Sequence, residues 1–271
     1  MRGSNELTVA KITIEAPVAS FRYPHFLVGR QPTYDMPPPS TIYGHIASAM
    51  GELPDPRMMR FGYHFTAVSR AKDLEHQHII WQGSPDKLSP EESAKFKVWH
   101  KAHSLALAAA VQPTLHDFLF GCRLVLYVDP PAVAEAFADP VFCTNFGRSQ
   151  DLAKIEKVET INLVEAEGAY IESTLLPFRP MRTRTGYGVT ALMPRYIGPP
   201  PEREPEFDTY IVLHEMIFAG KVDDTVIARN SSKRLINTLG QPKEMWLVDP
   251  DSPGIASVHR AVIFHRFVTE Q

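Results

Sequence analysis

The first 50 residues contain the pattern that constrains the fold most: a strand, a long loop and a helix, each marked by its own residue types. The side chains of residues 7–14 alternate along the segment, and many of them are β-branched, which predicts a strand. The prolines at 37–39 keep the chain extended, Ser40 is a favoured N-cap residue, and Gly51 is a typical helix stop. Apolar side chains recur at helical spacing between Ser40 and Gly51, so we expect this helix to pack one face on the sheet.

The next part of the chain predicts a second strand followed by an inserted helix. The strand is expected at 61–69, and its continuation as an extended ribbon through 79–81 is left open. Ser89-Pro90-Glu91-Glu92 combines a Ser-x-x-Glu capping box with a proline at the first helical position, which predicts a helix that runs to about Ala110. We therefore expect a helical insertion at about 72–113.

The strand and helix order resumes after this insertion. A third strand is expected at 123–128, a short helix at 129–137 and a fourth strand at 141–144. Without the insertion, the order is that of an α+β, ferredoxin-like (RRM-like) βαββαβ domain, which we place at residues 1–150. Residues 151–271 are expected to form a β-rich C-terminal extension or a small lobe.

Composition narrows the classes of function. The net charge of −3 at pH 7 provides no bulk attraction for nucleic acid, so such binding has to come from a local patch. Two cysteines without CxxC spacing argue against a disulfide framework and a zinc ribbon. No run of about 18 apolar residues is present and no secretory signal opens the sequence, so we expect a cytoplasmic protein with no membrane partner.

Familiar catalytic motifs are missing, because the sequence has no P-loop, no GxSxG elbow and no HExxH. Gly186 to Ala191 matches GxGxxA in letters only, since no apolar strand precedes it. Two pairs of histidines each share a face, namely His76 with His78 and His100 with His103. They leave open a metal site or, with Lys101, metal-free RNA cleavage. No carboxylate or cysteine accompanies them at ligand spacing, so we expect no metal and no cofactor.

The segment 173–201 is a candidate anion-binding patch, because it contains four arginines and neither lysine nor acid: Arg179, Arg182, Arg184 and Arg195. Arginine forks pair bidentately with phosphate oxygens, and the neighbouring tyrosines offer rings for base stacking. The alternative is a solvated face that the acidic residues of 202–208 neutralise.

The proline-rich loop before the first helix offers a second anionic subsite. Ser40 and Thr41 place two hydroxyls at the positive end of a helix, where phosphate is favoured. Guanidinium, ring and amide contacts of the kind that single-stranded RNA needs are offered nearby by Arg22, Tyr23, Gln31 and Tyr34. The alternative is that the aromatic residues of this loop only pack it on the sheet, namely Phe21, Phe26, Tyr34 and Tyr43.

Three blocks of the sequence resemble family five of the CRISPR-associated (Cas) proteins, and their blend is most similar to a type I-B branch. They are Ser20-Phe-Arg-Tyr-Pro24, Gln31-Pro-Thr-Tyr-Asp-Met-Pro-Pro-Pro-Ser-Thr-Ile-Tyr-Gly-His-Ile-Ala-Ser-Ala-Met-Gly-Glu52 and Phe146-Gly-Arg-Ser-Gln-Asp-Leu152.

The resemblance implies an RRM-like fold of the RAMP superfamily and a non-catalytic subunit of a type I Cascade surveillance complex for antiviral defence. Such a subunit caps the 5′ handle of CRISPR RNA (crRNA) and contacts the large and backbone subunits, with target DNA reached only through the complex. Its thumb corresponds to the insertion at about 72–113. The expected RNA-binding residues are Arg22, Tyr23, Gln31, Tyr34, Ser40, Thr41, Tyr43, Arg148, Ser149, Arg179, Arg182 and Arg184, of which the last three are a physical extension of the motif.

The resemblance also leaves one enzymatic alternative. A type I-C branch of this family is a metal-independent endoribonuclease that processes pre-crRNA and uses tyrosine, lysine and histidine side chains. This sequence offers Tyr43, Lys101 and either His100 or His103, but no lysine and histidine pair lies in a matching block.

Overall fold

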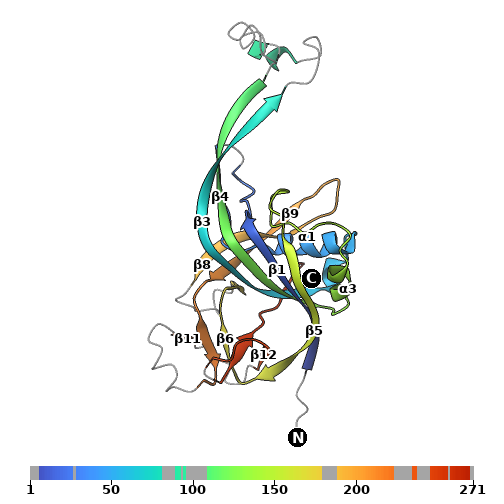
Figure 1. The fold of residues 1–271 in the computed structure, drawn as a ribbon, viewed down its shortest axis with the longest axis vertical. Coiled ribbons are helices and arrows are strands. Elements are labelled where there is room, and N and C mark those ends of the chain that lie inside the picture. The colour runs from blue at the N-terminus through green and yellow to red at the C-terminus, as the bar shows by residue number, and fades with distance from the viewer. Residues whose placement is uncertain are drawn as a thin grey trace.

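Four long antiparallel strands form the centre of the protein in the computed structural model (Figure 1). They are β1 (Glu6–Ala19), β3 (Arg60–Ile80), β4 (Ala109–Asp129) and β5 (Lys154–Ala166), in the spatial order β5-β1-β4-β3. The structure describes residues 6–26, 29–80, 89–92, 94–95, 109–178, 188–222, 234–236, 245–255 and 257–268. Within them the protein is mixed α+β and consists mostly of strands.

Side chains on both faces of the central sheet enter hydrophobic clusters. Ile12 and Ile14 of β1 pack in one cluster with Ile42 and Ile46 of helix α1 (Pro39–Met50). The short helix α3 (Val133–Ala138) covers the same face. Val9 points to the opposite face, where it belongs to a second cluster. Because successive side chains of a strand point to opposite faces of the sheet, β1 contributes to two hydrophobic clusters.

Helix α1 confirms its expected end but not its expected start. Gly51 ends the helix in the left-handed conformation at φ 76°, and its N–H donates to the Ala47 carbonyl oxygen at 2.9 Å. The N-cap is Pro38 rather than Ser40, with no capping side chain, so the prediction of Ser40 at the N-cap is wrong. Pro39 takes the first helical position because its fixed φ suits a helix start.

The insertion differs from the expected helix at its far end. Ser89 and Glu92 do form the predicted capping box, because Ser89 N–H donates to Glu92 Oε2 at 2.9 Å and Glu92 N–H donates to Ser89 Oγ at 3.3 Å. Ala109 and Ala110, however, lie in β4, so the prediction of a helix as far as Ala110 is wrong. The open alternative of a ribbon is confirmed, because β3 continues to Ile80 and pairs with β4 along its whole length. Figure 1 shows this ribbon projecting from the body of the protein.

The expected strand at 141–144 is also wrong. The short helix lies at α3, as predicted, but residues 141–144 form no strand, and Val141 and Phe142 lie in a bend. Val141 N–H donates to the Ala49 carbonyl oxygen at 3.0 Å and Phe142 N–H to that of Ser48 at 3.2 Å, so this segment closes the end of α1. The fourth strand of the centre is β5 instead.

The C-terminal region is β-rich, as expected, and both extends the main sheet and adds a second one. The main sheet runs β11-β10-β6-β13-β12-β5-β1-β4-β3-β14, with β2 beside β4, and the second sheet runs β7-β9-β8. The division of the chain into two domains at residue 150 stays a prediction. In the structure β5, which follows residue 150, pairs with β1, which precedes it. The bounds are β2 (Arg30–Gln31), β6 (Gly168–Ile171), β7 (Thr174–Pro177), β8 (Val189–Ile197), β9 (Pro205–Leu213), β10 (Ile217–Gly220), β11 (Arg234–Ile236), β12 (Trp246–Asp249), β13 (His259–Ala261) and β14 (His265–Arg266), with a 3-10 turn at Pro56–Met58.

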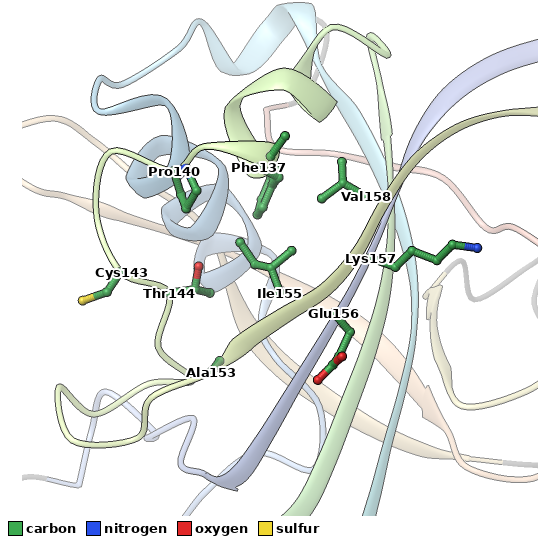
Figure 2. A pocket seen from close by; sticks show the side chains of 10 residues that line it. Phe137, Pro140, Cys143, Thr144, Ala153, Ile155, Glu156, Lys157 and Val158 are labelled. Atoms are coloured by element: carbon green, nitrogen blue, oxygen red, sulfur yellow. The ribbon is translucent and has the colours of Figure 1, made fainter.

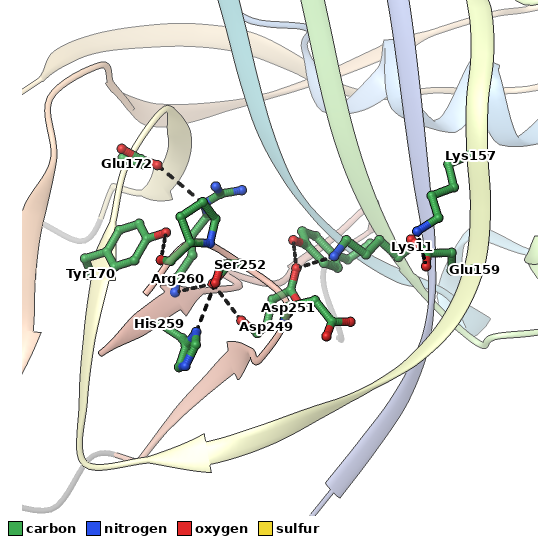
Figure 3. Close-up of polar contacts among 12 residues, drawn as sticks. Lys11, Lys157, Glu159, Tyr170, Glu172, Asp249, Asp251, Ser252, His259 and Arg260 are labelled. Carbon is green, nitrogen blue, oxygen red and sulfur yellow. Dashed lines mark hydrogen bonds and ion pairs between the residues drawn. The ribbon is translucent and has the colours of Figure 1, made fainter. Parts of the chain in front are cut away.

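A buried polar network joins the C-terminal strands to the central sheet (Figure 3). Lys11 Nζ lies 2.7 Å from Asp249 Oδ2, and the Tyr127 hydroxyl donates to the same oxygen at 2.6 Å. Burial raises the pKa of Asp249, but the hydrogen bonds from Lys11 and Tyr127 outweigh it, so that the pKa is lowered overall. Arg260 Nε lies 3.5 Å from Glu172 Oε1 in a second ion pair of this region. The network fixes β12 and β13 on strands that are far away in the sequence.

Candidate functional site

Three segments that are far apart in the sequence meet beside the N-terminal end of α1. Ser20 N–H donates to the Phe146 carbonyl oxygen at 2.9 Å, and Phe21 N–H donates to Thr33 Oγ1 at 2.8 Å. The rings of Phe21 and Phe146 lie 6.1 Å apart between centroids. The three blocks 20–24, 31–52 and 146–152 are therefore neighbours in the fold.

Gly147 makes the closest of these approaches. It has φ of +105°, and a Cβ atom built on it would lie 1.9 Å from the Ser20 carbonyl oxygen. Only glycine fits this position without moving the backbone, because it lacks the Cβ atom and tolerates positive φ. The Gly147 contact thus sets the distance between the loop at 146–152 and the end of β1.

A cavity of about 320 Å³, here called the α1 cavity, lies where the blocks meet. Five of the residues expected to bind RNA line it: Arg22, Tyr23, Gln31, Ser40 and Thr41. Its apolar wall includes Phe21, Pro194 and Ile197. The cavity combines one guanidinium, an amide, a phenol ring and two hydroxyls, which is a set of groups suited to a phosphate and its sugar.

The polar groups of the α1 cavity are partly organised in advance. Arg22 Nη1 donates to Gln31 Oε1 at 3.1 Å. Pro38 and Pro39 have no N–H, and Thr41 N–H donates to the Pro38 carbonyl oxygen at 2.9 Å. The helix end therefore offers the Ser40 N–H and the two hydroxyls to an anion, fewer donors than an ordinary helix start presents.

Tyr34 and Tyr43 lie beneath this region rather than on its surface. Tyr34 is 1% exposed and its hydroxyl donates to the Leu192 carbonyl oxygen at 2.8 Å. Tyr43 is 4% exposed and its hydroxyl donates to the Pro54 carbonyl oxygen at 2.6 Å. Burial raises the pKa of both phenols. The alternative of packing, left open by the sequence, describes these two side chains better than direct contact.

Arg148 and Ser149 lie in the loop that contacts Ser20. The Arg148 guanidinium forms a fork with Asp151, with Nε to Oδ2 and Nη2 to Oδ1 both at 2.9 Å. Ser149 is exposed, and its Oγ lies 3.5 Å from Gln150 Oε1. Arg148 is therefore compensated by an internal carboxylate, whereas Ser149 faces solvent.

Residues 179–187 of the arginine-rich segment lie outside the described residues, and they include Arg179, Arg182 and Arg184. Its fourth arginine, Arg195, is described and faces acidic neighbours. Arg195 Nη2 lies 2.7 Å from Glu206 Oε2, and Nη1 lies 3.5 Å from Asp208 Oδ2. At this position the neutralised face, which the sequence left as an alternative, is present.

A second cavity, of about 290 Å³ and here called the β8 cavity, is also lined by Tyr23. Tyr23, His25 and Asp35 line it together with residues 189–193 of β8 and its approach. Asp35 was not expected to be functional, although it lies inside the second family-like block. The one sequence signal for Asp35 is its position, because it follows Tyr34 and lies four residues after Gln31, both of which were expected to bind RNA.

A third cavity, of about 410 Å³, lies between α3 and β5 and holds none of the expected site residues (Figure 2). Glu156 and Lys157 at its rim belong to ion pairs, with Lys154 at 2.8 Å and with Glu159 at 2.6 Å. Its remaining lining is mostly apolar, with Phe137 and Ile155 facing it. It therefore offers little to an anionic ligand.

Of the histidines singled out in the sequence, one pair is described by the structure and the other is not. His76 and His78 are exposed on β3, whereas His100, Lys101 and His103 lie outside the described residues. Within the described ranges no group of three or more His, Cys, Asp or Glu side chains is placed to hold a metal ion. In the same part of the chain no helix is long and apolar enough to cross a membrane.

Comparison with known proteins finds a family model that matches part of this chain. Residues 10–73 match the model Cas_Cas5d, described as "CRISPR-associated protein (Cas_Cas5)". This segment contains two of the three blocks, and it confirms the resemblance to family five without settling a subtype. No curated protein sequence matches the chain.

Three solved structures that align with the chain have low sequence identity and TM-scores below 0.5. A chain of a CRISPR RNA-guided surveillance complex is 15% identical with a TM-score of 0.47, over 76% of this chain and 88% of that chain. A CRISPR protein from Archaeoglobus fulgidus is 9% identical with a TM-score of 0.44, over 77% and 87%. A chain of the type III-B Cmr-beta complex bound to cognate target RNA and AMPPnP is 11% identical with a TM-score of 0.42, over 76% and 85%.

Proposed function

We propose that the chain, which matches the Cas5 family model over residues 10–73, is a non-catalytic RNA-binding subunit of a CRISPR effector complex. In a type I Cascade complex it would hold the 5′ handle of crRNA. The observation that carries this proposal is the convergence of Arg22, Tyr23, Gln31, Ser40 and Thr41 on one cavity.

The chemistry of the α1 cavity supports a single-stranded RNA ligand. A guanidinium and hydroxyls at a helix end suit phosphate, and the Gln31 amide can reach a ribose or base edge. The Tyr23 ring adds a face on which a base can stack, which contributes about 1–3 kcal/mol per base in single-strand binders. These contacts need no positive net charge on the whole protein, which agrees with the net charge of −3.

The element order supports the finer fold assignment in this proposal. In this proposal the strands β5-β1-β4-β3, with α1 and α3 on one face, form a ferredoxin-like βαββαβ domain of the RAMP type, and the strand order is what supports it. In this assignment the β3 and β4 ribbon is the thumb of the family. It would lie across the RNA, while the body contacts the backbone and large subunits.

Binding of a labelled single-stranded RNA, measured by fluorescence anisotropy over a series of salt concentrations, tests the proposal. The full chain should bind with an affinity that falls as salt rises. Arg22→Ala should lower the affinity about tenfold, the typical value of one charged hydrogen bond. It should also reduce the salt slope by about 0.7 if the arginine neutralises one phosphate.

Arg57→Ala is the matched control, because Arg57 is exposed and paired with Asp55 at 2.9 Å, away from the cavity. If the Arg22 and Arg57 variants bound RNA with equal affinity, the assignment of the RNA-binding site to the α1 cavity would be refuted. Discrete cleavage of repeat RNA in the presence of EDTA would instead identify the metal-independent endoribonuclease.

A further inference from the structure

The β8 cavity shares one lining residue, Tyr23, with the α1 cavity, so the two cavities are neighbours. The β8 cavity is therefore a candidate place for a base of an RNA strand whose phosphate occupies the α1 cavity. Its volume of about 290 Å³ gives room for a single planar ring system.

The walls of the β8 cavity are flat and fixed. The Tyr23 ring stacks on the Tyr34 ring with centroids 3.8 Å apart and an interplanar angle of 25°. Tyr34 is in turn held by its hydrogen bond to the Leu192 carbonyl oxygen. The His25 ring stacks on Phe207 at 5.4 Å between centroids. Aromatic and imidazole faces that are already ordered favour a planar ligand, because little side-chain freedom is lost on binding.

Asp35 provides the polar group of the β8 cavity. Its Oδ1 lies 2.7 Å from Arg70 Nη1, and its Oδ2 lies 3.5 Å from His214 Nε2. The hydrogen bond from His214 lowers the pKa of Asp35, and burial opposes this while the charge of Arg70 adds to it. Arg70 also donates to the Thr33 carbonyl oxygen, so the carboxylate is held in one orientation.

An ionised carboxylate recognises only hydrogen-bond donors. Each oxygen has two lone pairs, so the two present contacts leave acceptor capacity on both oxygens of Asp35. Guanine presents two adjacent donors on its Watson–Crick edge, whereas uracil presents one N–H between two carbonyl oxygens that a carboxylate repels. Adenine and cytosine present an amino donor beside an acceptor nitrogen, an intermediate match.

We propose that the β8 cavity is a nucleobase subsite in which the Asp35 carboxylate selects guanine. This inference rests on the proposed function, since it assigns a base specificity to the same RNA-binding surface. Arg70 and His214 are positioning residues, because their contacts orient the carboxylate.

A set of oligouridine octamers with one guest base tests the proposal on the full chain. Guanine, adenine, cytosine, uracil or inosine is placed at each position in turn, and affinity is measured by fluorescence anisotropy. At one position guanine should bind about tenfold more tightly than uracil, as expected for hydrogen bonds to a charged acceptor. Inosine, which lacks the exocyclic amino group, should lose most of this gain.

Asp35→Asn should abolish the preference for guanine while oligouridine still binds. Asp55→Asn is the matched control, since Asp55 is also ion-paired but lies outside both cavities, and it should keep the preference. The inosine comparison uses the unmodified protein and therefore does not depend on the folding of a variant.

The outcomes separate the two proposals. Equal affinity for all guest bases, or a guanine preference that survives Asp35→Asn, overturns the subsite and leaves RNA binding intact. Absence of binding to every octamer overturns both the subsite and the proposed function.

Discussion

The Lys11 and Asp249 pair provides the sharpest test of how the C-terminal strands are attached to the central sheet. We predict that Lys11→Met destabilises the protein strongly. The side chains are 13% and 1% exposed, so the variant leaves a buried carboxylate that keeps only neutral donors, the Tyr127 hydroxyl and the Asp251 N–H. Removing one partner of a buried ion pair costs about 3–5 kcal/mol.

The double variant distinguishes the loss of pairing from a loss of packing. In Lys11→Met with Asp249→Asn the buried charge is gone, while the amide oxygen can still accept from Tyr127. We therefore expect the double variant to recover more than half of the loss in free energy of unfolding. Lys157→Met is the control, because the exposed Lys157 and Glu159 pair should contribute about 0–1 kcal/mol.

Urea unfolding followed by tryptophan fluorescence measures all of these values, since Trp246 lies in β12. Equal effects of Lys11→Met and Lys157→Met would refute the view that this network holds the C-terminal strands. A double variant as unstable as Lys11→Met alone would show that packing, rather than an unpaired charge, causes the loss.

Two further predictions concern the neighbourhood of the α1 cavity. Burial lowers the pKa of His45 to about 4, so its neutral form contributes stability above pH 6.5 that is lost as the pH falls toward 4. Between pH 7.5 and pH 5 this group should lower the free energy of unfolding by about 2 kcal/mol, and His45→Phe should remove that part of the pH dependence in urea titrations. Gly147→Ala should destabilise the protein and weaken RNA binding because its Cβ atom meets the Ser20 carbonyl oxygen, whereas Gly44→Ala, with open space on α1, should stabilise it by up to about 1 kcal/mol. Thermal unfolding of both glycine variants measures the contrast, and equal melting temperatures would contradict it.

The sequence predicted those parts of the fold that depend on local signals. The β-branched alternation at 7–14 lies in β1, Gly51 ends α1, and Ser89 and Glu92 form their capping box. Each of these depends on residues within a few positions of one another, so local chemistry was sufficient. The same loop and helix start contain the five expected residues that line the α1 cavity, and their role in RNA binding stays a prediction.

The errors arose where distant segments decide the structure. The alanine-rich stretch before Pro113 favours a helix locally, yet Ala109 and Ala110 pair with Ile80 and Ile79 in the ribbon. Residues 141–144 are apolar and resemble a strand, but their N–H groups donate to carbonyl oxygens at the end of α1. No periodicity in one segment reveals a partner that lies far along the chain.

Asp35 was missed for a related reason. Its partners Arg70 and His214 come from β3 and from the end of β9, so the cluster exists only after the two sheets pack together. Tyr34 and Tyr43 show the converse, since their sequence context indicated contact with a ligand while the fold places them in the core.

Photocrosslinking tests the central claim, that the α1 cavity holds RNA, most directly. The full chain is bound to an RNA that contains 4-thiouridine, irradiated, digested and analysed by mass spectrometry. We predict crosslinks to Tyr23 and to the peptide that spans residues 31–41. Crosslinks confined to the α3 and β5 region, around Phe137 and Ile155, would contradict the account.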